Sequence, residues 1–485
     1  MAKALRLGHK GRPNRPRPKD YVSFMLSKRL IALLAAPAFM LGGCETIQSL
    51  GDHAAATVGL GDDAPHTYTA SQVSQAQRSG IAVADEPLAA KAGAAVLAAH
   101  GNAADAVAAM FFTLTATYPV AAGLGGGGIC LMRDTSGQVT EFDFLTKAPR
   151  AGGAYALPGA VAGFATLQKL YGALPWQRVV APGEAYAATG FPVSQALAVR
   201  LASAQNILRL DAALAAEFLD ETGKPLAAGA ETKNLALGES LSEIRLNGAD
   251  GFYKSAVAAR IAAYSAAQGG GITAGELAAT AALQGPARSR GTGNFITWLP
   301  GARTGAGAFT ASLLDNLSRN PRAGAPAAVR QSLADFGIAG LPGDLGSTGF
   351  AAVDAGGAAA ACAVTLNGPF GSGRMAAGTG IVLGATPSGP AGLASAFLTP
   401  VIATTGGAVG LAGAGAGGPN GTAAALQAVL DAAAGRRLGK RGDLRGTGAA
   451  PYDAVNMISC GEDACVALSD PGAHGLGVAA DSATQ

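Results

Sequence analysis

Apolar and polar positions in the first part of the chain follow the pattern of two consecutive helices. Residues 87–100 have a helix-favouring composition that stops at Gly101, and Asn102 then provides the cap of a second helix, from Ala103 to about Thr115. We expect these two helices to precede the first strand of the fold.

Strand-like patterns come next. The glycine-rich residues 123–128 run into an apolar stretch that ends near Asp134, and residues 138–144 alternate between apolar and polar positions, which is typical of a hairpin partner. Residues 155–335 have mostly helical periodicity, most clearly around Ala256–Gly270.

Strand patterns return after Ser347 and cover residues 350–354, 359–366 and, more weakly, 381–383. Helical composition follows over residues 421–434. Helices that flank paired strands indicate an α/β layered sandwich.

The composition supports a packed interior, because 49% of the 485 residues are hydrophobic and only 14% are charged. The charge is uneven, since residues 1–30 contain nine Lys or Arg residues and one acid, Asp20. The rest of the chain is therefore mildly acidic, which gives no reason to expect a nucleic-acid partner.

The N-terminal region has the architecture of an export signal. Basic residues Lys28 and Arg29 precede an apolar run over residues 30–41, which is too short to span a bilayer permanently and ends in Leu-Gly-Gly-Cys at Cys44. This ending resembles a bacterial lipoprotein signal, so residues 1–43 are expected to be a leader, Cys44 to be lipidated and residues 44–75 to form a tether. The implied location is the periplasm, on the outer membrane. The alternative is an ordinary cleaved signal with a coincidental cysteine.

Five cysteines are present, and none has the spacing of a metal site. Cys460 and Cys465 flank a predicted hairpin tip and could close a disulfide in an exported protein. Cys130 and Cys362 lie in apolar strand-like runs and are expected to be unreactive core thiols.

The candidate chemistry centres on the letters GDLGSTGFAAVD at residues 343–354. A turn explains two hydroxyls between glycines, but so does a chain that cuts itself between Gly346 and Ser347 and uses the new α-amine as a base. The residues cannot decide between these readings on their own. A Ser-His-Asp triad is disfavoured because histidine is scarce, and Gly125–Gly128 lack the motif of a nucleotide site, so no cofactor is expected.

Ordered motifs along most of residues 80–480 resemble the γ-glutamyltransferases, of the N-terminal-nucleophile hydrolase superfamily. The stretches that carry the resemblance are ADEPLAAKAGAAVLAAHGNAADAVAA, GLGGGGICLMRD, LPGAVAGFATLQKLYGALPW, GADGFYKSAVAARI, GGGITAGELAA and STGFAAVDAGGAAAACAVTLNGPFGSG. The resemblance implies a four-layer αββα sandwich with a large-subunit-like region, 76–346, and a small-subunit-like region, 347–485, that form a heterodimer of the chain's own fragments.

The same resemblance assigns roles to individual residues. Ser347 falls on the nucleophile, where the family has Thr, and Thr348 on the next hydroxyl. Thr365 falls on the threonine that supports the nucleophile, and Asn367 on a residue that holds the amino acid end of the substrate. Gly417 and Gly418 fall on the paired glycines of the oxyanion hole, whose backbone N–H groups donate to the developing charge.

The chain also departs from the family. The family's Asp-Phe-Arg, whose arginine binds the substrate carboxylate, becomes Asp-Phe-Leu at Leu145. Its acidic amine-binding stretch becomes GATPSGPAG over 384–392, its paired serines become Ala396-Phe397, and the region between Trp298 and Gly346 is shorter. The glutamyl pocket is therefore expected to be altered.

These observations predict an enzyme that hydrolyses small peptide, γ-glutamyl or acyl amides, or transfers their acyl group, through an acyl-Ser347 intermediate. Two alternatives stay open. One is a catalytically inactive relative that serves as a periplasmic binding or envelope protein. The other is an acylase of the cephalosporin-side-chain type.

Overall fold

The computed structural model describes one compact unit within Asp52–Gln485. The described residues are 74–76, 80–341, 343–387, 389–436, 438, 452–461, 464–470 and 472–480. The expected leader, the expected lipidation site Cys44 and nearly all of the expected tether lie outside these residues.

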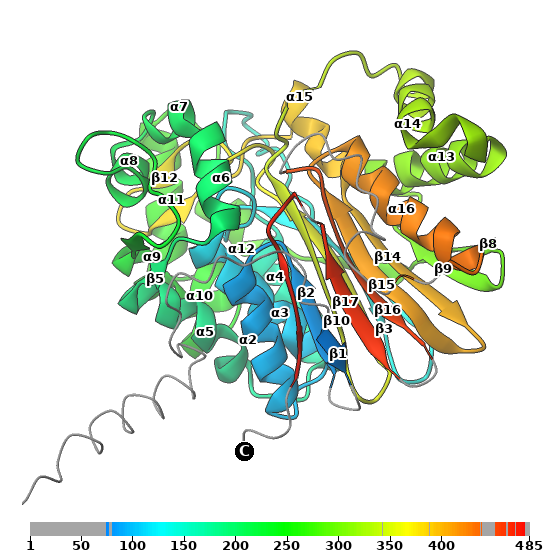
Figure 1. Ribbon diagram of the computed structural model, residues 1–485. Helices are drawn as coiled ribbons and strands as arrows, with labels where there is room; N and C mark the ends of the chain where they lie inside the picture. The colour runs from blue at the N-terminus through cyan, green and yellow to red at the C-terminus, as the bar shows by residue number, and fades with distance from the viewer. Residues whose placement is uncertain are drawn as a thin grey trace, which may run out of the picture. The chain divides into compact units, whose positions relative to one another are not determined.

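Two seven-stranded antiparallel sheets form the centre of the unit (Figure 1). The first sheet has the order β18 (Leu476–Ala479), β2 (Ile81–Ala84), β10 (Ser347–Val353), β11 (Ala359–Thr365), β3 (Gly127–Arg133), β4 (Val139–Asp143) and β7 (Leu283–Pro286). The second has the order β1 (Ser74–Ala76), β17 (Cys465–Ser469), β16 (Ala454–Cys460), β15 (Ala408–Ala416), β14 (Thr399–Thr405), β9 (Phe295–Leu299) and β8 (Arg288–Thr292).

Helices cover the outer face of each sheet. The first sheet is covered by α2 (Pro87–Ala98), α3 (Ala103–Thr117) and α4 (Ala160–Tyr171), while α5 (Trp176–Thr189) packs on α3 and α9 (Leu235–Asn247) packs on α5. The second is covered by α13 (Gly305–Arg319) and α16 (Pro419–Ala433), and α14 (Gly324–Asp335) packs on these two helices. The remaining helices of the described residues are α6 (Gln195–Ser203), α7 (Gln205–Leu208), α8 (Ala212–Phe218), α10 (Asp250–Tyr253), α11 (Ala256–Ala267), α12 (Ala274–Ala278), α15 (Gly389–Gly392) and the 3₁₀ turns Pro321–Ala323 and Ala394–Phe397. Two short strand pairs join β5 (Phe191–Pro192) to β6 (Glu231–Thr232) and β12 (Met375–Ala376) to β13 (Ile381–Val382).

The inner faces of the two sheets pack against each other through small and branched side chains, among them Val83, Leu131, Ala351, Ile402 and Ile458. Alternate residues of β10, such as Phe350 and Ala352, point instead into the core beneath the helices of the first sheet. The arrangement is therefore helix, sheet, sheet, helix, which confirms the expected four-layer αββα sandwich.

The two predicted N-terminal helices are present as α2 and α3. Asn102 accepts hydrogen bonds from the backbone of Ala104 and Asp105, and Asp105 accepts one back from Asn102, which forms a capping box. The expectation that these helices precede the first strand is wrong, because β2 lies before α2. Its four apolar residues are too few to show the alternation of a strand.

Two further strand groups depart from the predicted pattern. The region 155–335 is mostly helical but contains β7, β8 and β9. Strand β15 is rich in alanine and glycine, residues with low strand propensity. Strand β14 contains Pro400, and a proline within a run weakens a strand prediction. Packing against the first sheet and α16 outweighs that weak local preference.

The cysteines form two disulfides. Cys460 and Cys465, at opposing ends of β16 and β17, are joined. Cys130 and Cys362 are also joined, so the expectation of two free core thiols is wrong. They are cross-strand partners on β3 and β11, and this pairing was not visible from their separation of 232 residues.

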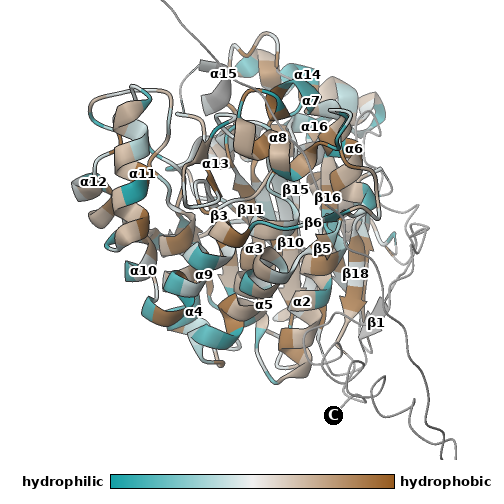
Figure 2. Ribbon diagram, turned by 90° about the vertical axis from the view of Figure 1, so that its left-hand side faces the viewer, coloured by the Kyte–Doolittle hydropathy of each residue, from teal (hydrophilic) through white to brown (hydrophobic). Residues whose placement is uncertain are grey.

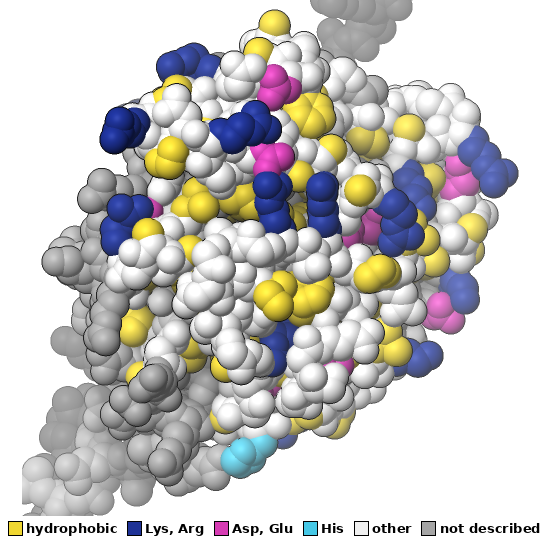
Figure 3. Space-filling view, turned by 90° about the vertical axis from the view of Figure 1, so that its right-hand side faces the viewer, with side chains coloured by type: hydrophobic (Ala, Val, Ile, Leu, Met, Phe, Trp, Pro, Cys, Tyr) yellow, Lys and Arg dark blue, Asp and Glu magenta, His cyan; other side chains and the backbone are white. Residues whose placement is uncertain are grey.

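Hydrophilic residues lie on the outward surfaces of α4, α9 and α11 (Figure 2), as expected for helices with one buried face. On another face, Lys and Arg side chains are spread among uncharged ones, with Asp or Glu beside several of them (Figure 3). Among the ion pairs of the described residues, Arg290 and Arg319 both pair with Asp315. No helix among the described residues is long and apolar enough to cross a membrane.

Candidate active site

Ser347 is the first residue of β10 and lies opposite Thr365 of β11. It is buried, with 2% of its surface exposed. Gly346 before it has a φ of +59°, and a Cβ there would lie 1.9 Å from the carbonyl group of Gly368. Only glycine fits this turn, so the junction is held in a conformation that other residues would not adopt.

The carbonyl oxygen of Gly346 accepts two hydrogen bonds from β11 and the residue after it. The Thr365 hydroxyl donates at 2.9 Å and the Leu366 N–H at 3.1 Å. The Thr365 hydroxyl itself accepts from the N–H of Asn367 at 2.9 Å, which orients it. These donors polarise the carbonyl of the peptide bond between Gly346 and Ser347.

The Ser347 hydroxyl accepts a hydrogen bond of 2.8 Å from the N–H of Gly417. Gly417 has a φ of +89°, and a Cβ there would lie 1.6 Å from the carbonyl oxygen of Tyr452, so no side chain fits. Gly418 follows as the N-cap of α16. The structure thus brings Ser347, Thr365 and Gly417 together around one peptide bond.

Thr348 points to the opposite side of β10 from Ser347, as neighbouring strand residues do. Its hydroxyl donates to Asp85 Oδ2 at 2.6 Å, and Asn456 Nδ2 donates to Asp85 Oδ1 at 2.6 Å and to the carbonyl of Gly349 at 2.7 Å. Burial raises the pKa of Asp85, while the hydrogen bonds from Thr348 and Asn456 lower it. Thr348 is therefore part of a buried polar group that links β2, β10 and β16.

Arg200 and Asp344 are two site residues that the sequence analysis missed. Arg200 lies on α6 with 1% of its side chain exposed, and its Nη2 and Nε bond the carboxylate of Asp344 at 2.5 and 3.1 Å. Its Nη1 donates to the carbonyl of Ser347 at 3.2 Å. The guanidinium also lies 5.3 Å from the ring centre of Tyr118. The one available signal was a lone arginine within the apolar stretch SQALAVRLA.

Asn367 lies beside the junction, and none of its hydrogen bonds among the described residues is to Ser347. Its Nδ2 donates to Thr146 Oγ1 and to the carbonyl of Ala385, both at 2.8 Å. Its buried Oδ1 has no hydrogen-bond partner among the described residues. That oxygen can accept a hydrogen bond from a donor group of a ligand.

Leu145, which stands where the γ-glutamyltransferases have an arginine, has apolar surroundings. Leu145 is half-buried and packs against a small apolar cluster made of Ile129, Ala306, Ala363, Leu398 and Ala414. Lys147, the nearest cation along the chain, is exposed. The described residues contain no group of three or more His, Cys, Asp or Glu side chains that could hold a metal ion.

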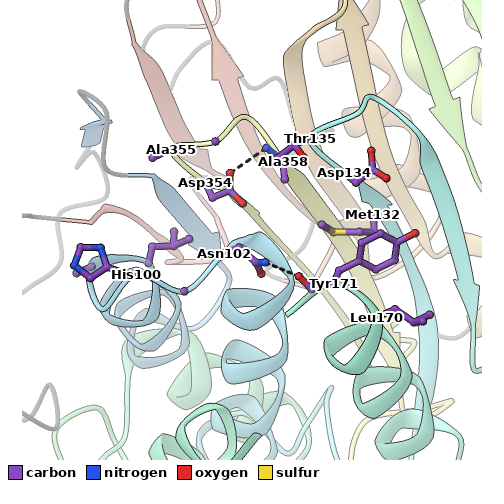
Figure 4. Close-up of a pocket in the computed structure, with 14 residues that line it drawn as sticks. His100, Asn102, Met132, Asp134, Thr135, Leu170, Tyr171, Asp354, Ala355 and Ala358 are labelled. Carbon is purple, nitrogen blue, oxygen red and sulfur yellow. Dashed lines mark hydrogen bonds between the residues drawn. The ribbon is translucent and has the colours of Figure 1, made fainter. Parts of the chain in front are cut away.

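A separate pocket of about 580 Å³ lies near Asp354, which follows the other end of β10 (Figure 4). Seven strand residues at about 3.3 Å each place it roughly 20 Å from Ser347. The Asp354 carboxylate is occupied by the N–H groups of Ala103 and Ala358, and Asn102 donates to the carbonyl of Tyr171. This pocket is therefore distinct from the junction and contains no arrangement typical of catalysis.

Comparisons with known proteins place this geometry in context. Residues 89–289 match the sequence model of the family described as Gamma-glutamyltranspeptidase. The glutathione hydrolase proenzyme of Escherichia coli (strain K12) is 31% identical over 282 residues, 54% of this chain and 47% of that protein. The Acylase ACY 1 proenzyme of Pseudomonas sp. (strain SE83) is 31% identical over 226 residues, 41% of this chain and 40% of that protein. The chain thus spans about half the length of the curated relatives it matches.

The crystal structure of cephalosporin acylase from Bacillus halodurans is similar over more of the chain. It superposes with a TM-score of 0.67 at 17% identity and covers 86% of this chain and 98% of the acylase. At that identity the likeness concerns the fold. Motifs, sequence relatives and architecture agree, and the chain is therefore related to the γ-glutamyltranspeptidase family and has the fold of the N-terminal-nucleophile hydrolases.

Proposed function

We propose that this protein is a self-processing amide hydrolase or acyltransferase in which Ser347 is the nucleophile. The observation that carries the proposal is the geometry of the junction: the carbonyl of Gly346 is held by Thr365 and Leu366 while the Ser347 hydroxyl lies on the amide of Gly417. The word proenzyme in the names of two sequence relatives is consistent with processing of the chain.

Processing begins with attack of Ser347 Oγ on the carbonyl carbon of Gly346. The bond between that carbon and the Ser347 nitrogen breaks, the hydroxyl proton passes to the nitrogen, and an ester joins Gly346 to Ser347 Oγ. Water then hydrolyses the ester and leaves a carboxylate on Gly346 and a free hydroxyl and α-amine on Ser347. Thr365 and Leu366 stabilise the negative charge that develops on the carbonyl oxygen.

Turnover uses the same hydroxyl with the new α-amine as its base. Ser347 Oγ attacks the carbonyl of a substrate amide, and the amides of Gly417 and Gly418 receive the oxyanion. Such donors typically lower a barrier by about 3–4 kcal/mol. The leaving amine takes the proton, and water or an acceptor amine then removes the acyl group from Ser347.

The apolar surroundings of Leu145 favour substrates whose acyl group lacks the free α-carboxylate of a γ-glutamyl group. Leu145 and its apolar neighbours offer no charge to such a group, whereas the unpartnered Asn367 Oδ1 can still accept from an amide or amine. A panel of anilides with and without that carboxylate tests this preference directly.

A catalytically inactive relative that acts as a binding or envelope protein is the main alternative, and an acylase of the cephalosporin-side-chain type is the other. An enzyme is supported if the purified wild type contains a fragment that starts at Ser347 and the Ser347→Ala variant is not cleaved. A chain that stays whole under all conditions favours the binding protein. Cleavage of carboxylate-free acyl amides alone favours the acylase.

We also propose that the protein is exported and anchored in the periplasm through a lipid on Cys44. The two disulfides support an oxidising compartment. In Cys44→Ser, the protein should leave the membrane fraction or remain unprocessed at its leader, whereas Cys460→Ser should fractionate as the wild type. Unchanged fractionation of Cys44→Ser would refute the anchor.

A further inference from the structure

We infer that Arg200 is a positioning residue for cleavage of the bond between Gly346 and Ser347, and that it acts together with Asp344. The inference rests on the proposed self-processing function. The guanidinium of Arg200 connects Asp344, which precedes the bond to be cleaved, with Ser347, which follows it.

The guanidinium contacts the chain before and after the bond. Nη2 and Nε bond the Asp344 carboxylate, and Asp344 Oδ1 accepts from the N–H of Gly346 at 2.7 Å. Nη1 donates to the carbonyl of Ser347 at 3.2 Å. Arg200 thereby fixes the backbone on both sides of the left-handed Gly346, while Thr365 and Leu366 hold the carbonyl between them.

The burial of this pair argues for a positioning role rather than a stabilising one. The side chains of Arg200 and Asp344 are 1% and 10% exposed. Desolvating two charges costs about as much as their attraction returns, so a buried pair is weak evidence for stability. The planar guanidinium of Arg200, however, supplies several hydrogen-bond donors in fixed directions, and a lysine in the same place cannot reproduce them.

Fixed geometry matters for this reaction because attack requires the hydroxyl to approach the carbonyl carbon closely and along one direction. Misplacement by about 1 Å can slow such a step by about 100-fold. Arg200 gives up no proton in the scheme above. Its effect is therefore on the rate of attack and not on the hydrolysis of the ester that follows.

The test follows cleavage of freshly made full chain over time on reducing gels, with the masses of the fragments as identification. Arg200→Lys keeps the charge opposite Asp344 and should fold, and we expect it to cleave about tenfold more slowly than the wild type. Arg200→Met and Asp344→Asn should cleave more slowly than Arg200→Lys, at rates up to about 100-fold below that of the wild type. The double variant should be no slower than the slower single variant, because the two residues act as one unit. Arg245→Lys, which alters the more exposed pair with Glu184 on α9 and α5, is the matched control and should cleave as the wild type does.

Hydroxylamine, which cleaves esters, separates positioning from a later defect. It should not restore cleavage in the Arg200 variants, since their block precedes the ester. Restoration by hydroxylamine, or wild-type rates in folded Arg200→Lys and Asp344→Asn, would overturn the inference and leave self-processing intact. A wild-type chain that never cleaves would overturn the proposed function and this inference together.

Discussion

Ser347 and Thr348 are adjacent hydroxyls with different surroundings. The Ser347 hydroxyl meets the amide of Gly417, whereas the Thr348 hydroxyl donates to a buried carboxylate, Asp85. Ser347→Ala should therefore abolish self-cleavage, while Thr348→Ala should slow it by loosening the strand without stopping it. Reducing gels of both variants check this. Loss of cleavage in Thr348→Ala together with cleavage in Ser347→Ala would show that Ser347 is not the nucleophile.

Leu145 stands where a substrate carboxylate would be bound in the proposed function, and we expect it to weaken that binding. A charge-assisted contact to an arginine is worth about 1.5–3 kcal/mol, so its absence corresponds to roughly a 10- to 150-fold lower kcat/KM for γ-glutamyl substrates. Leu145→Arg should raise kcat/KM for a γ-glutamyl anilide by about tenfold or more, and Leu145→Met should not. Release of nitroaniline measures both. Efficient hydrolysis of glutathione by the wild type would contradict the altered pocket.

Glu86 gives the protein a stability that depends on pH. It is fully buried, caps α2 through Ala89 and accepts from Thr117, and burial raises its pKa to about 6 from 4.5. The folded state therefore binds the proton more tightly, so the free energy of unfolding falls as pH rises from about 4.5 through about 6, by about 2 kcal/mol from this residue.

Glu86→Gln imitates the protonated form. The variant should match the wild type in urea unfolding at pH 4 and exceed it by about 2 kcal/mol at pH 8. Glu239→Gln, at an exposed position of α9, should change neither value by more than about 0.5 kcal/mol. A wild type that is the more stable protein at pH 8 would contradict this account of the Glu86 carboxyl.

At the scale of elements, the disulfide between β3 and β11 crosses the proposed cleavage point. Cys130 lies before Gly346 and Cys362 lies after it, so the bond should hold the two fragments together covalently. Cleaved protein should run as one band without reductant and as two bands with it, while Cys362→Ala should give two bands under both conditions. Two bands from the wild type without reductant would show that this disulfide does not form.

The sequence predicted those helices and strands that have a clear local signal, such as a helix cap, a glycine turn or alternating apolar and polar residues. The Asn102 cap, the hairpin of β3 and β4, and the strands β10 and β11 were predicted because caps, glycine turns and alternation leave local marks in the sequence. Strands β14 and β15 were not predicted, since Pro400 interrupts the pattern of β14 and the alanines and glycines of β15 favour no element, so that tertiary packing decides. The candidate site was predicted through motif resemblance for Ser347, but Arg200 is brought to it by folding alone, 147 residues away in sequence.

At the scale of the whole molecule, the two proposed fragments are interleaved. Strands β10 and β11, which follow the junction, lie between β2 and β3, which precede it, and β14 pairs with β9 in the other sheet. Cleavage would therefore leave both sheets complete, and neither fragment contains all the strands of either sheet. This arrangement allows the chain to be cut at Gly346 without losing the site that the cut would activate.

The mass of purified protein, measured under reducing conditions, tests the central claim most directly. Self-processing predicts two species, one that ends at Gly346 and one that spans 347–485 and begins with the free α-amine of Ser347. A single species that still contains the bond between Gly346 and Ser347, from folded protein kept at neutral pH, would contradict the account.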